Sequence, residues 1–323
     1  MGNLVSPQLA DYQAAAAKYK KELLTMPIIG LKEILPYATI RFGIRYKEVV
    51  GDIAVNAQIA PYKTTMKSAE DVNLNFRELE TFFGGLVQPF DPNQAATLII
   101  GQNAMTKGEG IKNAEIAKRV LVAIAKSITE NLNAVLWSAV RNANGTTTKD
   151  LFNGWDTITT AEVTAGKIAA DKGNYVKLTE EITSENAVDL LKKAYRDAHK
   201  VLRGVKTFMF VPQDVLDAYN DAYSTLHNAT PYVQGFEQLY LEGSNKKCEI
   251  VALTSKADSK YIHISTKENM LIGCDQLSDT EKLEVEKHAP FTLDYVATMF
   301  FGVDFESIDA RRLMVVEMVL PEA

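Results

Sequence analysis

Few residues in this 323-residue chain have the types and spacing that metal or redox chemistry needs. Four histidines are present, at His199, His227, His263 and His288. None belongs to an HExxH or HxH motif, and none stands at zinc-ligand spacing from Cys248 or Cys274. These two cysteines are 26 positions apart and form no CxxC pair. We therefore predict no metal site and no cofactor, and we interpret both cysteines as buried free thiols in a reducing setting.

The motifs for phosphate binding and nucleophilic catalysis are also missing. Residues 107–110, KGEG, precede a predicted helix as phosphate-binding loops do, but the GK[ST] ending and a third glycine are absent. A hinge before the helix is the better interpretation. The sequence contains no GxSxG elbow, and carboxylate pairs such as Glu78 with Glu80 are typical of a solvated surface. The sequence therefore predicts that the chain is not an enzyme.

Apolar residues alternate with mostly cationic ones between positions 39 and 47. The apolar set is Ile40, Phe42, Ile44 and Tyr46, and the other set is Arg41, Gly43, Arg45 and Lys47. This period of two predicts a half-buried strand with a cationic outer face. Because both aromatic residues fall on the opposite face, the pattern disfavours a stacking surface for nucleic acid.

The charged residues near this strand instead indicate contact with another subunit. The candidate contact residues are Arg41, Arg45, Lys47, Arg77, Glu78 and Glu80. Both signs of charge are present, and ion pairs between subunits contribute specificity more than affinity. The alternative is an ordinary solvated surface.

The overall composition is that of a folded globular protein, with 46% hydrophobic and 24% charged residues. The formal net charge of −6 lacks the basic excess that drives phosphate binding, so any nucleic-acid contact is expected to be local and weak. The first residues, MGNLVSPQLADYQ, show no basic region followed by an apolar one, and no run of about 18 apolar residues occurs. We therefore expect no cleaved secretion signal and no membrane contact.

The first half of the chain predicts an arm, a hairpin and a long helix. Helix formers fill residues 7–24, and Pro27 and Gly30 would end this arm. Residues 72–87 form a second extended stretch, interrupted by Gly84-Gly85, and would pair with the first strand in a projecting hairpin with its tip near residues 62–71. Residues 111–142 then carry an apolar stripe at helical spacing over about 45 Å.

The second half predicts a domain of helices around a sheet, beginning after a polar region that reaches Thr179. Ser184 would cap a helix that Gly204 closes, and Pro212 would open another after a strand at 207–211. Further strands are expected at residues 249–253, 261–264, 270–274, 293–304 and 313–319. Helices and strands do not alternate regularly, so the fold class is α+β and not a doubly wound sheet.

This order of elements resembles the major capsid protein of tailed bacteriophages, whose fold is shared with encapsulin shells and the herpesvirus capsid floor. Four stretches add to the resemblance. They are LFNGW at 151–155, the strand and Val-Pro turn at 208–214, YIHISTKENMLIGCD at 261–275, and FFGVDFESIDARRLMVV at 300–316. None is a catalytic signature, and the resemblance is carried by their order along nearly the whole chain.

The resemblance implies a division of the chain into capsid regions. These would be an N-terminal arm at 1–36, an extended β-hairpin loop at 37–90, and a peripheral domain with its spine helix at 91–150. An axial α+β domain would occupy most of 151–288, and strands at 289–323 would return to the peripheral domain. No long charged segment precedes the expected fold, which implies a separate scaffolding protein or a self-assembling subunit.

The resemblance also implies partners and a location. The chain would assemble with itself as hexamers and pentamers in an icosahedral virion shell, built in the bacterial host cytoplasm. Portal, scaffolding or decoration proteins would bind the shell, and packaged double-stranded DNA would contact its inner face non-specifically. Lys63 and Lys67 lie near the expected loop tip, but no lysine and asparagine pair for crosslinking can be matched.

Three alternatives remain open at the level of sequence. An encapsulin-like nanocompartment shell would have the same fold and enclose a cargo enzyme. A cytoplasmic α/β enzyme with an unrecognised site would form a small oligomer with a concave pocket. A phage tail or adaptor protein would form rings or tubes instead of closed shells.

Overall fold

The computed structural model describes residues 7–55, 72–104, 113–226, 239–275 and 283–320. In the first half of the chain the elements are α1 (Leu9–Ile29), β1 (Thr39–Phe42), β2 (Lys47–Val55), β3 (Val72–Glu80), β4 (Phe82–Phe90), α2 (Pro92–Ala104) and α3 (Asn113–Val135). The central elements are α4 (Trp155–Thr164), β5 (Tyr175–Glu181), α5 (Ala187–Asp197), α6 (Lys200–Gly204), β6 (Thr207–Val211) and α7 (Gln213–Leu226). The last elements are β7 (Cys248–Ala252), β8 (Tyr261–Ser265), β9 (Met270–Asp275), β10 (Leu283–Ala289), β11 (Thr292–Phe305) and β12 (Leu313–Val319).

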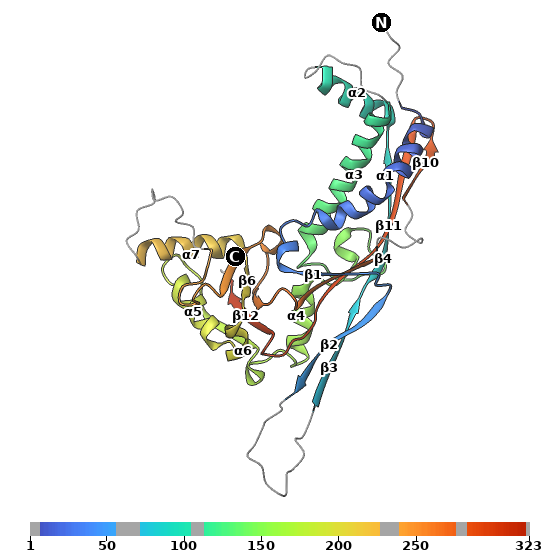
Figure 1. The fold of residues 1–323 in the computed structure, drawn as a ribbon. Coiled ribbons are helices and arrows are strands. Elements are labelled where there is room, and N and C mark those ends of the chain that lie inside the picture. The colour runs from blue at the N-terminus through green and yellow to red at the C-terminus, as the bar shows by residue number, and fades with distance from the viewer. Residues whose placement is uncertain (1–6, 56–71, 105–112, 227–238, 276–282, 321–323) are drawn as a thin grey trace, which may run out of the picture.

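The first sheet is built around β11, which has 14 residues and pairs with β4, β9 and β10, while β1 adds to β9. Helices α1 and α3 cover one face of this sheet, as Figure 1 shows in its upper part. Apolar residues of α3 at three- and four-residue spacing, including Ala117, Leu121 and Leu132, are fully buried there. The spacing of the sequence therefore determines which face of α3 packs on the sheet.

The second sheet has the order β5-β12-β8-β6-β7 and forms the compact region around α5 and α7 (Figure 1). All five residues of β6 are buried, as expected for a central strand that is covered on both faces. Leu191 of α5 and Tyr219 of α7 pack on one face of this sheet. On the other face, a core that includes Trp137 and Trp155 joins it to the first sheet.

Strands β2 and β3 form a separate two-stranded sheet that projects away from both larger sheets (Figure 1). Their antiparallel register runs from Lys47 opposite Glu80 to Val55 opposite Val72. The predicted projecting hairpin is confirmed for its second strand. Its first strand is β2 and not the predicted stretch at 39–47, since β1 pairs with β9, and the predicted tip at 62–71 lies outside the described residues.

The predicted continuous strand at 39–47 is wrong. Strand β1 ends at Phe42, and the chain turns before β2 because Gly43 and Tyr46 adopt positive φ angles of 78° and 69°. Left-handed residues cannot continue a strand, so the alternation of side chains breaks there. The expected apolar face is lost as a result: Ile44 is buried, while Phe42 and Tyr46 are exposed.

The predicted single stretch at 72–87 is also wrong, because the chain breaks at Thr81 and not at the two glycines. The Thr81 amide donates to the carbonyl oxygen of Tyr46 (2.7 Å), and its hydroxyl donates to that of Ile44 (3.0 Å). Gly84 and Gly85 lie inside β4. A Cβ atom at Gly84 would approach Leu151 to 2.7 Å, so this glycine admits a close neighbour instead of ending the strand.

Several boundaries in the rest of the chain differ from the predictions. Helix α3 ends at Val135 and not at 142, and the helix expected from Ser184 to Gly204 is split into α5 and α6. The split occurs because Ala198 is extended and the side chain of His199 accepts the amide of Val201, which caps a new helix. Strand β12 pairs with β5 and β8 in the second sheet, whereas β11 lies in the first sheet. The last two strands therefore do not lie together in one region, as the division at 289–323 expected. The sequence did not predict β2, α2, α4, β5 or β10.

Candidate functional site at the base of the hairpin

The hairpin leaves the body of the protein where β3 crosses β11 and β9. Two glycines permit this crossing: a Cβ atom at Gly302 would overlap the carbonyl oxygen of Glu80, and one at Gly273 would lie 2.7 Å from the Thr81 side chain. Next to the crossing, Leu79 is fully buried against Ile44 and other apolar residues. The base of the hairpin is therefore seated by close packing over a short length of β3.

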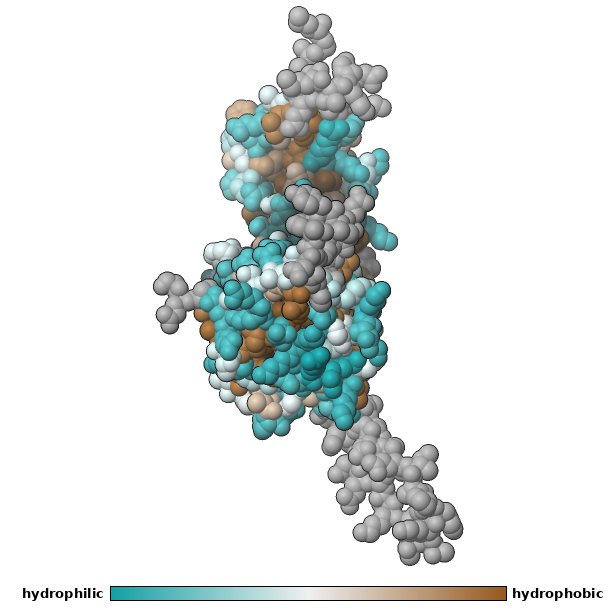
Figure 2. Space-filling view, turned by 90° about the vertical axis from the view of Figure 1, so that its left-hand side faces the viewer, coloured by the Kyte–Doolittle hydropathy of each residue, from teal (hydrophilic) through white to brown (hydrophobic). Residues whose placement is uncertain are grey.

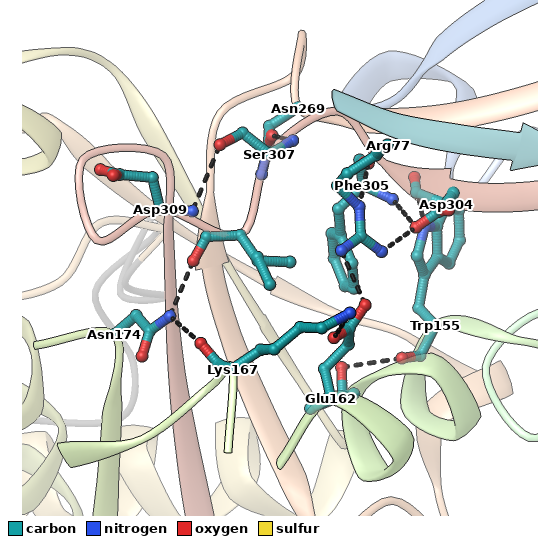
Figure 3. A network of polar contacts seen from close by, with 12 residues as sticks. Arg77, Trp155, Glu162, Lys167, Asn174, Asn269, Asp304, Phe305, Ser307 and Asp309 are labelled. Carbon is teal, nitrogen blue, oxygen red and sulfur yellow. Dashed lines mark hydrogen bonds and ion pairs between the residues drawn. The ribbon is translucent and has the colours of Figure 1, made fainter. Parts of the chain in front are cut away.

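Arg77 lies on β3 just beyond this crossing and connects the hairpin to two other elements (Figure 3). Its Nη1 atom is 2.7 Å from Oε1 of Glu162 on α4, and its Nη2 atom is 2.8 Å from Oδ1 of Asp304 on β11. Its Nε atom donates to the carbonyl oxygen of Phe305 (3.2 Å). Only 14% of the Arg77 side chain is exposed, so these contacts are shielded from solvent.

The charges of Arg77, Glu162 and Asp304 stabilise one another, and their side chains are largely buried. Burial alone would lower the pKa of Arg77, but Asp304 and Glu162 outweigh that effect and raise it. Burial raises the pKa of Asp304, and the opposing effects of Arg77 and of the Phe305 amide offset this only in part. Glu162 also lies 3.3 Å from Nζ of Lys167. The cluster thus joins two cations with two carboxylates.

Further hydrogen bonds fix the protein segment that carries Asp304. The indole Nε1 of Trp155 donates to the carbonyl oxygen of Asp304 (3.1 Å). The Ser307 amide donates to the side chain of Asn269 (2.8 Å), and the Asn174 side chain donates to the carbonyl oxygen of Ile308 (2.7 Å), as Figure 3 shows. The carboxylate that receives Arg77 is therefore held in a rigid segment.

The structure brings the six predicted contact residues to the hairpin and its base, and gives each cation a carboxylate of its own chain. Arg41 lies 3.9 Å from Glu306, and Arg45 lies 2.6 Å from Asp275. Lys47 lies 2.8 Å from Glu78 and 2.6 Å from Glu80, so its ion pairs join only the two strands of the hairpin. The side chains of Arg41, Arg45 and Lys47 are about half exposed, which leaves room for a second partner. Their contact with another subunit stays a prediction.

Two grooves flank this region. One of about 1620 Å³ lies between the hairpin and α4, lined by Val49, Phe76 and charged residues that include Lys167. The other, of about 980 Å³, is bounded by α1, α2, α3 and β4 and is lined by apolar residues such as Leu98 and Ile124. Figure 2 shows hydrophobic side chains gathered on the upper part of the molecule, where these helices lie. Large exposed apolar surfaces are typical of interaction sites.

A second polar cluster is enclosed between α4 and the second sheet. Nζ of Lys256 lies 2.9 Å from Asp156, 2.7 Å from the Ser259 hydroxyl and 4.0 Å from the centroid of the Trp137 ring. Burial lowers the pKa of Lys256 to about 8, although Asp156 opposes the shift. The Lys256 side chain is fully buried, so it cannot meet a substrate, and we interpret the cluster as structural.

Within the described ranges, no three His, Cys, Asp or Glu residues are grouped to hold a metal ion, and no helix is long and apolar enough to cross a membrane.

Comparison with known proteins identifies the fold. No family model and no curated protein matches the sequence. A chain of the satellite phage P4 procapsid that includes the size determination protein has a similar structure, with 12% identity, coverage of 94% of this chain and 100% of that one, and a TM-score of 0.58. A chain of the cyanophage A-1(L) capsid gives 12% identity, 91% and 93% coverage, and a TM-score of 0.52. The SrpI encapsulin of Synechococcus elongatus has 9% sequence identity, with coverage of 88% of this chain and 86% of that one, and a TM-score of 0.47. The chain has the tailed-phage major capsid fold.

Proposed function

We propose that this chain is a structural subunit that assembles into the icosahedral capsid of a tailed bacteriophage. The observation that carries the proposal is the likeness of its fold to a phage procapsid chain over 94% of its length and the whole of the other chain. In this fold, large surfaces of the subunit stay exposed and can contact other copies of the chain. We assign the chain no catalytic role.

The shape of the subunit suits assembly. Strands β2 and β3 pair with no other strand among the described residues, and their outer side chains are poorly covered: Phe76 is 71% exposed and Val49 is 65% exposed. Burial of such residues against a neighbouring copy would be favourable, at about 25 cal/mol for each Å² of apolar surface. Many such contacts in a closed symmetric arrangement give large collective stability.

The partners follow from this role. The subunit would form hexamers and pentamers with itself, and portal, scaffolding or decoration proteins would bind the shell in the bacterial host. Packaged double-stranded DNA would touch the inner face without sequence preference. The net charge of −6 supports a weak hold on DNA, since a strong hold requires many cations that release counterions.

The first test is the assembly state of the chain expressed alone, and then together with the products of neighbouring genes. We expect electron microscopy and light scattering to show closed shells of uniform size or rings of subunits. A stable monomer or dimer under every condition would refute the proposal and favour an enzyme. Open tubes would indicate a tail protein, and shells that enclose a cargo protein instead of DNA would indicate an encapsulin.

Reversal of the charges of Arg41 and Arg45 is expected to abolish shell formation. Because Arg45 is the partner of the buried Asp275 carboxylate, the reversal should also lower the free energy of unfolding of the subunit. Both side chains are about half exposed beside the hairpin, where a carboxylate of a neighbouring copy could reach them. The measurement is the shell yield of the Arg41→Glu/Arg45→Glu double variant by sedimentation, with circular dichroism to confirm folding. The Arg41→Lys/Arg45→Lys variant keeps the charge and should assemble. Normal yield of the reversed variant would remove these residues from the interface.

A further inference from the structure

The direction of the hairpin depends on very few contacts with the rest of the chain. Its two strands pair only with each other in the part of the chain that the structure describes, and its packing on the body is concentrated around Leu79 and the Gly302 crossing. Side chains are described for residues 47–51 and 76–80 of the hairpin. Among these, Arg77 is the residue that forms ion pairs with the body. A rotation of the hairpin about the crossing would therefore be resisted mainly by Arg77.

We propose that Arg77 is a positioning residue that sets the angle of the hairpin, and that this angle selects the curvature at which neighbouring copies meet. The inference rests on the proposed shell function and adds to it a residue that determines particle size. Its basis is the geometry in Figure 3, where one guanidinium is held by acceptors on β11 and α4.

The chemistry of arginine suits this role. The planar guanidinium directs its N–H groups along fixed directions, so the three contacts with Glu162, Asp304 and the Phe305 carbonyl define its position and its orientation. A lysine ammonium could balance the charge but would not fix the orientation. Since Asp304 is almost fully buried and is held in a rigid segment, the position of Arg77 is transmitted to β3.

A small change at the base is amplified along the hairpin. Strand β2 has nine residues and extends about 25–30 Å from Lys47 at a rise of about 3.3 Å per residue. A rotation of about 10° at the base would therefore move its far end by about 4–5 Å, roughly the spacing between neighbouring strands. A shift of this size would change which residues of a neighbouring copy the hairpin meets.

The matched variants are Arg77→Gln and Lys47→Gln. Each removes one cation and two ion pairs from the hairpin, but those of Lys47 stay within the hairpin, whereas those of Arg77 reach the body. The loss of one unit of net charge is common to both variants. Only Arg77→Gln leaves the buried Asp304 without its cation, so the denaturant unfolding of both variants is measured alongside. Arg77→Lys tests separately whether charge without the fixed geometry is enough.

The angle itself can be measured on unassembled subunits with spin labels at Val49→Cys on the hairpin and Lys177→Cys on β5. Both positions are 65% exposed, and the native Cys248 and Cys274 are buried. We expect a narrow distance distribution for the otherwise native chain and for Lys47→Gln, and a broad or shifted one for Arg77→Gln. An unchanged distribution for Arg77→Gln would overturn the proposal.

Particle size is the second readout, measured by electron microscopy of shells from the same variants without labels. Arg77→Gln should give several diameters or open sheets, while Lys47→Gln keeps the native diameter; native diameters for both would overturn the link to curvature. If the native chain forms no shell, the proposed function fails, and the spin-label distances still test the positioning role. If Arg77→Gln does not fold, Glu162→Ala removes the contact of Arg77 with α4 and is judged by the same two readouts.

Discussion

Replacement of Asp156 by alanine is expected to lower the free energy of unfolding of the subunit by about 3–5 kcal/mol at pH 7. Asp156 is the carboxylate that balances the fully buried Lys256 ammonium, at 2.9 Å. In its absence Ser259 and the Trp137 ring remain as neighbours, and neither carries a negative charge. A buried charge that loses its partner keeps the cost of dehydration without the compensating attraction.

The measurement is denaturant unfolding of unassembled subunits, followed by tryptophan fluorescence, because Trp137 and Trp155 are both buried beside the cluster. The Asp156→Ala/Lys256→Met double variant should recover most of the loss, since it removes both charges and fills the space with an apolar chain of similar length. A loss of only about 0.5 kcal/mol for Asp156→Ala, as is usual for surface substitutions, would contradict this account.

The same cluster predicts a dependence of stability on pH. The pKa of Lys256 is lowered in the folded chain to about 8 from its ordinary value of 10.5. Between these values Lys256 binds more protons in the unfolded chain than in the folded one, so the free energy of unfolding should rise as pH increases from 8 towards 9. The full shift corresponds to about 3 kcal/mol. Above about pH 9 the buried Cys248 thiol, whose pKa burial raises to about 12, acts in the opposite direction. Above about pH 10 buried tyrosines such as Tyr219, whose pKa burial raises to about 12, act in the same direction as Cys248. The Lys256→Met variant should lose the rise between pH 8 and 9.

The parts of the fold that could be predicted are those with a strong local pattern. The apolar stripe of α3 and the Pro212 start of α7 each define an element from neighbouring residues alone. The turn between β1 and β2 could not be predicted this way, because Tyr46 adopts a left-handed conformation that its side chain does not favour. Likewise, Gly84-Gly85 is locally a strand breaker, and only the tertiary contact of Gly84 with Leu151 explains its place inside β4.

The ion pairs within the hairpin, of Lys47 with Glu78 and Glu80, join residues that were all predicted, but the ion pairs that join the hairpin to the rest of the chain were predictable on one side only. Arg77 was identified as a contact residue, but Asp304 and Glu162 lie 227 and 85 positions away along the chain, and no local pattern links them. A carboxylate inside the apolar stretch FFGVDF does indicate a buried cationic partner. The identity of that partner depends on the crossing of β3 over β11, which is a property of the tertiary fold.

That crossing gives the second large effect: Gly302→Ala is expected to destabilise the subunit by about 3 kcal/mol or more. A Cβ atom at Gly302 would overlap the carbonyl oxygen of Glu80 and crowd the backbone of Thr81. These are backbone atoms of a strand already held by the Thr81 hydrogen bonds, so they cannot move aside as the end of a flexible side chain would. Either β3 is pushed away from β11 or the chain fails to fold.

Gly85→Ala is the matched control, because Gly85 lies in β4 of the same sheet and the nearest atom to an added Cβ there is the Thr298 methyl at 3.8 Å. That distance is an ordinary van der Waals contact, so the control should unfold at nearly the native denaturant concentration. The measurement is again denaturant unfolding, with the spin-label distance from Val49→Cys to Lys177→Cys recorded for any Gly302→Ala protein that folds. Equal unfolding midpoints for the two variants would show that β3 can move away from β11 at Gly302 without loss of stability. The crossing would then not restrain the hairpin, and a restraint other than the crossing and Arg77 would be needed.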